Sequence, residues 1–157
     1  MSIAQELIDR IDGRVGELHE TALEELRKFQ NIRVRGKAKG EKKEWGKLIL
    51  LVTERGRNSF QITWHRKKWV RKTNVSPGEN PWLMHSTYIK KGKADRYPMK
   101  TLLAEVAPWE KEEIPRFEDV FAQIRSELGA LMKCKKILVG YLQHKTAQLD
   151  GGELSRR

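Results

Sequence analysis

Two long stretches of helical periodicity enclose the middle of the chain. In residues 2–30 apolar side chains recur every three or four positions, at Ile8, Ile11, Val15, Leu18, Ala22, Leu26 and Phe29. The same spacing runs from Phe117 to about Thr146, at Val120, Phe121, Ile124, Leu128, Leu131, Leu138 and Leu142. A helix of this kind needs a partner for its apolar stripe. We therefore expect the two helices to pair antiparallel, within one chain in preference to between two copies.

The section between the helices has the periodicity of strands. A short apolar run predicts an inner strand at Lys47–Glu54, and strict alternation predicts a half-buried strand at Ser59–His65. The basic triplet 66–68 is interpreted as a turn that leads into a third strand, Trp69–Thr73. A loop at 73–81 and a fourth strand, Leu83–Lys90, follow. The predicted fold class is α+β, with an N-terminal helix, an antiparallel sheet of three or four strands, and a long C-terminal helix packed on the first.

The remaining segments complete a single predicted domain, 1–157. Residues 31–46 are rich in Lys and Gly and predict a basic linker or arm; its part 33–43 is either a solvated loop or a segment that settles on a phosphate backbone. The sheet region spans 47–97 and the helical region 98–146. A short helix is expected to begin at Pro98, and Pro108 and Pro115 each suit a first helical turn. Residues 147–157 read as a polar tail.

The positive charge of the chain is concentrated in its middle. Residues 31–100 hold 19 Lys and Arg against 5 Asp and Glu, a net charge of +14, within a total of +11. Such a concentration repels itself unless a polyanion offsets it, and phosphate backbones are the commonest such partner. A basic surface kept for solubility is the simpler alternative. No basic amphipathic helix accompanies the charge, which disfavours a membrane surface as the partner.

Other classes of protein lack support in the sequence. The longest apolar run is five residues, far below the roughly 20 of a membrane helix. No secretory signal is visible, and the single cysteine, Cys134, excludes an internal disulfide, so we expect a cytoplasmic protein. No His spacing is typical of a metal site, and no glycine loop is typical of nucleotide binding. We expect no catalysed reaction, no metal and no cofactor.

The candidate binding surface is a basic aromatic hairpin. Alternation places Phe60, Ile62 and Trp64 on one face and the polar side chains of residues 61, 63 and 65 on the other, where they could read base edges of a duplex. The triplet at the predicted turn would contact phosphates. The tryptophans are expected in the core in preference to stacking on bases. The predicted nucleic-acid-binding residues are Gln61, Thr63, His65, Arg66, Lys67, Lys68, Arg71, Lys72, Lys90, Lys91, Lys93 and Arg96.

These same segments carry a resemblance to a known family. The stretches ITWHRKKWV (62–70), STYIKKGK (86–93), RYP (96–98) and WE (109–110) resemble the MobI family of conjugative transfer proteins, over about residues 58–130. The resemblance implies a non-catalytic accessory factor of DNA mobilisation, encoded by integrative conjugative elements and related plasmids. It would bind double-stranded DNA at the origin of transfer beside a separate relaxase.

Two alternatives stay open on the sequence. One is an RNA-binding regulatory protein of a phage or plasmid that uses the same basic patch. The other is a protein-interaction module whose basic face docks an acidic partner. The candidate site residues rest on charge and geometry alone.

Overall fold

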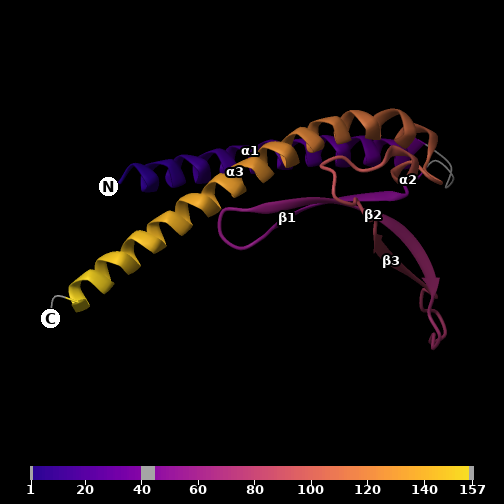
Figure 1. Ribbon diagram of the computed structural model, residues 1–157. Coiled ribbons are helices and arrows are strands. Elements are labelled where there is room, and N and C mark those ends of the chain that lie inside the picture. The colour runs from indigo at the N-terminus through magenta and orange to yellow at the C-terminus, as the bar shows by residue number, and fades with distance from the viewer. Residues whose placement is uncertain (1, 40–44, 156–157) are drawn as a thin grey trace.

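The chain folds into two long helices with a three-stranded sheet between them in sequence. The computed structural model describes the backbone of residues 2–39 and 45–155, and the side chains of 2–35 and 45–151. Its elements are α1 (Ile3–Lys39), β1 (Leu48–Glu54), β2 (Phe60–Arg71), β3 (Trp82–Tyr88), α2 (Met99–Leu102) and α3 (Pro108–Ser155). The strands are antiparallel in the order β1-β2-β3, which confirms the predicted fold class (Figure 1).

The two long helices lie side by side and antiparallel (Figure 1). Near the start of α1, Arg14 forms an ion pair with Glu127 at 2.7 Å, and Asp12 pairs with Lys135 at 2.6 Å. These contacts join the beginning of one helix to the later part of the other. The helices therefore pair within one chain, as the apolar stripes predict.

One face of the sheet packs against this helix pair. Trp64 of β2 is fully buried there, with its ring edge-on to Phe29 of α1 at 5.2 Å and to Phe121 of α3 at 6.2 Å. Phe60 and Ile62 are buried on the same face, as alternation predicts. Aromatic pairs in such geometry stabilise a core beyond the area that they bury. The core thus sits between the two helices and the inner half of β2.

Helix α1 continues through residues that were predicted as a linker. Residues 31–39 are helical, and Ile32 packs against the core. The prediction was wrong here because Lys, Arg and Ala all favour helices, and cations stabilise a helix C-terminus. Residues 40–44 of the predicted arm lie outside the described residues.

Strand β2 is continuous where a turn was predicted. Arg66 and Lys67 pair with Leu48 and Lys47 on one side, and residues 66–68 pair with Thr87, Ser86 and His85 of β3 on the other. One hairpin turn lies at residues 55–59, where Gly56 and Asn58 adopt positive φ angles of 59° and 57°. The other lies at 72–81, which confirms the loop predicted at 73–81. The triplet offers no residue suited to positive φ, so the ladder runs through it. The sheet therefore has three strands.

The helices of the last third also differ from the predicted bounds. Pro108 is the first residue of α3, as expected, but Pro115 lies inside the helix, and residues 147–155 are helical instead of a tail. Helix α2 has only four residues and follows Pro98. The start of α3 is held by the buried carboxylate of Glu110, which accepts the N–H of Ala107 at 3.0 Å, of Lys47 at 2.7 Å and of Leu48 at 3.0 Å. One side chain thus caps α3 and fixes the beginning of β1.

We expect Gly46→Ala to destabilise the fold by about 1–3 kcal/mol, because an added methyl group overpacks a filled site. A Cβ at this position would lie 2.9 Å from Cζ2 of Trp109 and 3.4 Å from Oε2 of Glu110. The matched control is Gly16→Ala in α1, where a Cβ meets nothing within 4 Å. That change should stabilise the protein by about 0.5–1 kcal/mol. Urea unfolding measures both, and a gain in stability for the Gly46 variant would contradict the packing.

Candidate nucleic-acid interface

A two-stranded ribbon projects from the body of the protein. We call residues 66–88 the projecting ribbon: it comprises the outer half of β2, the loop 72–81 and β3 (Figure 1). Every residue of β3 is exposed, and so are residues 68–71 of β2. A free two-stranded hairpin is marginally stable in water. This one is anchored because β2 continues without interruption into the core.

The register of β2 and β3 determines which side chains share a face. His65 lies opposite Tyr88, Lys67 opposite Ser86, Trp69 opposite Met84, and Arg71 opposite Trp82. Opposite residues of an antiparallel pair point to the same side. All eight therefore lie on the face that continues from Gln61 and Thr63, which we call the open face. The other face of the ribbon has Lys68 opposite His85 and Val70 opposite Leu83.

Large apolar side chains stand exposed on the open face of the ribbon. Their exposed fractions are 59 % for Trp69, 51 % for Trp82, 52 % for Tyr88 and 43 % for Met84. Trp64 is in the core as expected, but the expectation for Trp69 was wrong. Because β2 is unbroken, alternation from Trp64 puts position 69 on the opposite face. The predicted turn hid that signal.

The predicted cations of the ribbon differ in how freely they face solvent. Lys68 and Arg71 are exposed, and Lys67 and Lys72 are half-buried. Arg66 is held against the body of the protein, since its guanidinium donates to the carbonyl of Thr101 at 3.1 Å and also to that of Ala104. The ribbon as a whole has five Lys and Arg and one acidic residue, Glu79.

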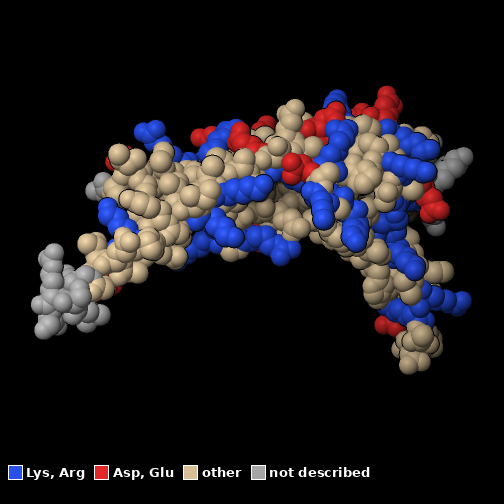
Figure 2. All heavy atoms as spheres, in the orientation of Figure 1, with Lys and Arg blue, Asp and Glu red and all other residues tan. Residues whose placement is uncertain are grey.

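A second basic group follows β3. Lys90 and Lys93 are exposed, whereas Lys91 donates to the backbone carbonyls of Gly92, at 3.4 Å, and Ala94. Arg96 forms an ion pair with Asp119 of α3. Figure 2 shows basic side chains along the underside of the body and over the ribbon, with most acidic side chains on the opposite, helical side. The two predicted basic groups therefore lie on either side of Tyr88: the ribbon runs outward from it, and Lys91 lies beside the inner half of β2.

The three predicted base readers lie on the inner half of the open face. Thr63 is only 8 % exposed, and its hydroxyl lies 3.0 Å from Nε2 of His65. The ring of His65 packs edge-on to Tyr88 at 5.6 Å, and Gln61 accepts a hydrogen bond from Arg55. One polar atom of each of these side chains thus has a partner within the chain. The base-reading roles of these three residues stay a prediction.

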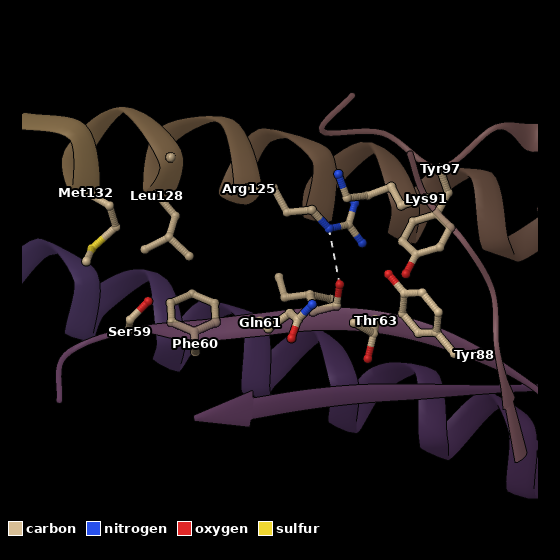
Figure 3. A pocket seen from close by; sticks show the side chains of 12 residues that line it. Ser59, Phe60, Gln61, Thr63, Tyr88, Lys91, Tyr97, Arg125, Leu128 and Met132 are labelled. Carbon is tan, nitrogen blue, oxygen red and sulfur yellow. Dashed lines mark hydrogen bonds between the residues drawn. The ribbon is translucent and has the colours of Figure 1, made fainter. Parts of the chain in front are cut away.

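A cleft of about 220 Å³ separates this part of β2 from α3 (Figure 3). Arg125 points from α3 into it, and its Nε donates to the carbonyl of Ile62 at 3.3 Å. Its other nitrogens donate to both carboxylate oxygens of Glu118, at 2.8 and 3.0 Å, and to the carbonyl of Asp95 at 2.8 Å. The guanidinium also lies over the ring of Tyr97, 5.0 Å from its centroid. The sequence did not predict this site, because Glu118 and Arg125 look in the sequence like ordinary charged residues on the surface of a helix.

The carboxylate of Glu118 is fully buried and has four donors. Besides Arg125, it accepts Nε1–H of Trp64 at 3.0 Å and the backbone N–H of Tyr97 at 2.7 Å. A buried ion pair is tolerated when its remaining hydrogen bonds are satisfied. This pair is structural, since its polar atoms already bind the chain.

Within the described residues, no three potential metal-ligating side chains lie close enough to hold an ion. No helix of this part of the chain is long and apolar enough to cross a membrane. A sequence model of the MobI protein family matches residues 18–139, more than three quarters of the chain. The chain belongs to the MobI family. Searches of curated proteins and of solved structures found no match.

Membership of the MobI family relates the chain to DNA mobilisation in conjugative transfer. The matched region begins within α1 and ends within α3, so it includes the whole sheet and the projecting ribbon. The resemblance seen in the sequence is thereby confirmed. The projecting ribbon and the buried pair of Glu118 and Arg125 both lie within the region that matches the MobI family.

In this MobI protein, Glu118→Gln should destabilise the fold by about 3–5 kcal/mol, because it leaves the Arg125 guanidinium buried without a counter-charge. The control is Glu127→Gln, which removes the exposed ion pair with Arg14. That change should cost about 0–1 kcal/mol. Urea unfolding at neutral pH compares the two variants. Equal losses in the free energy of unfolding would show that the buried ion pair stabilises the fold no more than the exposed one.

Burial raises the pKa of Tyr97 to about 12. The neighbouring hydroxyl of Tyr88 raises this pKa further, whereas the backbone N–H of Trp64, which donates to the Tyr97 hydroxyl, lowers it. The hydroxyls of these two tyrosines point toward one another in Figure 3. An ordinary tyrosine, with a pKa of about 10, is about nine-tenths ionised at pH 11, whereas Tyr97 should be about one-tenth ionised. Tyrosinate absorbance at pH 11 should therefore be nearly equal in the wild type and in Tyr97→Phe.

The same shift predicts how stability depends on pH. Because the folded chain holds the Tyr97 proton more tightly than the unfolded chain, the stabilisation is complete below about pH 10 and is lost as pH rises toward 12. The free energy of unfolding should fall more steeply over this range in the wild type than in Tyr97→Phe. Parallel pH curves would contradict the assignment.

Proposed function

We propose that this chain is a non-catalytic DNA-binding accessory factor of conjugative transfer. It would act in the cytoplasm, at the origin of transfer, beside a separate relaxase. The observation that carries the proposal is the projecting ribbon, an anchored basic extension with side chains exposed on both of its faces, on a protein of the MobI family.

Electrostatics supports DNA as the ligand. The ribbon holds a net charge of +4, and exposed Lys90 and Lys93 adjoin its base. Cations in this arrangement would contact phosphates and position the protein without reading sequence. The phosphate contacts that we propose are Lys67, Lys68, Arg71, Lys72, Lys90 and Lys93.

The proposal assigns no reaction to the chain. Among the side chains that the structure describes, the two fully buried carboxylates, Glu110 and Glu118, already bind backbone N–H groups, Trp64 and Arg125. Groups engaged in this way support the fold and are poorly suited to proton transfer, which needs a group within reach of a substrate. Nicking of the DNA would belong to the relaxase.

If the protein neutralises roughly 5–8 phosphates, the logarithm of its binding constant for duplex DNA should fall against the logarithm of salt concentration with a slope of about −5 to −7. Fluorescence anisotropy with a duplex from the element's own origin of transfer measures this slope. A slope shallower than about −2 would contradict a phosphate-binding surface. It would favour a protein partner instead.

A matched pair of variants locates the surface. Lys68→Ala with Lys72→Ala should flatten the slope by up to about 2. Lys28→Ala, on α1 and paired with Glu25 at 2.9 Å, should leave it unchanged. If the ribbon variant and Lys28→Ala changed the salt slope equally, the DNA would not bind at the ribbon.

A further inference from the structure

We propose that the open face of the projecting ribbon binds unpaired bases of single-stranded DNA. The indoles of Trp69 and Trp82 are the stacking platforms, and Lys67 and Arg71 contact the phosphates between them. This inference rests on the proposed function and names the form of DNA that the ribbon takes.

The first support is the exposure of the two indoles. Trp69 is 59 % exposed and Trp82 is 51 % exposed, on the ribbon that projects from the body of the protein (Figure 1). The register puts Trp82 opposite Arg71, and this pair is the next one on the open face after the pair of Trp69 and Met84. The indoles are therefore diagonal neighbours, and Tyr88 continues the row toward the body. Proteins that bind single strands use such rows because every base has a face that can stack.

The second support is the charge between the rings. Lys67 and Arg71 flank Trp69 along β2 on the open face, so cations alternate with aromatic side chains. An apolar protein partner would leave these charges desolvated, whereas a nucleic-acid backbone complements them. The charge thus favours a polyanion over a second protein on this face.

The third support is a pocket where the ribbon joins the body. Its volume is about 170 Å³, and it is lined by Arg33, Trp45, Gly46, Lys47, Lys67 and Trp69. Two indoles and three cations therefore surround one hollow beside Trp69. This combination suits a flat aromatic base with its phosphate.

An intact duplex fits this face poorly. Its bases are stacked on each other and present only their edges in the grooves. The ribbon offers the rings of Trp69 and Trp82 on this face, and the bases of an intact duplex have no free face on which these rings could stack. Unpaired bases are the ligand whose faces are free to stack.

The test compares the full-length chain with two double variants of the ribbon. Trp69→Thr with Trp82→Thr removes both rings but keeps side chains that favour strands. Val70→Thr with Leu83→Thr is the matched control, since those residues face each other on the other side of the ribbon. Anisotropy measures binding to an oligothymidine of about twelve nucleotides, a length within the usual range for single-strand sites. A random duplex of similar length is measured in parallel.

We expect the tryptophan variant to bind oligothymidine about 25-fold or more weakly, at least about fivefold for each lost ring. Its affinity for the duplex should stay within about threefold of the wild type, and so should both affinities of the control variant. Trp69→Phe with Trp82→Phe keeps aromatic faces and should restore most of the binding.

Unchanged oligothymidine binding by the tryptophan variant would overturn this inference and leave the proposed function intact. A wild-type chain that binds neither oligothymidine nor duplex at low salt would overturn the proposed function itself. Tighter binding to oligouridine than to oligothymidine, by tenfold or more, would overturn DNA as the ligand. A wild-type dimer that the tryptophan substitutions dissociate would show that this face joins two copies of the chain, which also overturns the inference.

Discussion

The buried pair of Glu118 and Arg125 is the interaction on which the arrangement of the sheet depends. Removing two charges from water is costly unless their hydrogen bonds are complete. Here the carboxylate binds Trp64 and Tyr97 as well as Arg125, and the guanidinium also binds the carbonyls of Ile62 and Asp95. The pair therefore holds together α3, the inner half of β2 and the segment that follows β3. These are the parts from which the ribbon projects.

A projecting ribbon is useful for binding only if its base is rigid. The base is fixed on one side by this pair and on the other by Glu110, which ties the first residues of β1 to the start of α3. Strand β2 belongs both to the core, through Trp64, and to the ribbon, through Trp69. Packing in the core thus stabilises the projecting ribbon, which itself buries little apolar area. That arrangement leaves both faces of the ribbon free to meet a ligand.

Much of the fold could be predicted because its signals are local. Helical spacing located both long helices, and alternation from Phe60 to Trp64 identified the buried face of β2. The errors came from features with two local meanings. A run of three cations suits a turn or an exposed strand, and at 66–68 the pairing of all three residues with β3 makes it a strand. Residues 31–39 had too few apolar positions to show a period, although their helix propensity was good.

The sequence by itself determined the class of fold, the concentration of positive charge in the middle segment and the resemblance to the MobI family, because each depends on composition or short-range order. The tertiary structure alone decided that Glu118 and Arg125 meet inside the protein, seven residues apart on one helix with partners from β2 and from the segment after β3. It also decided that Trp69 faces solvent while Trp64 is buried. The reason is physical: burial depends on what packs against a strand, and the helix pair covers the face of β2 that carries Trp64, whereas Trp69 lies on the other face.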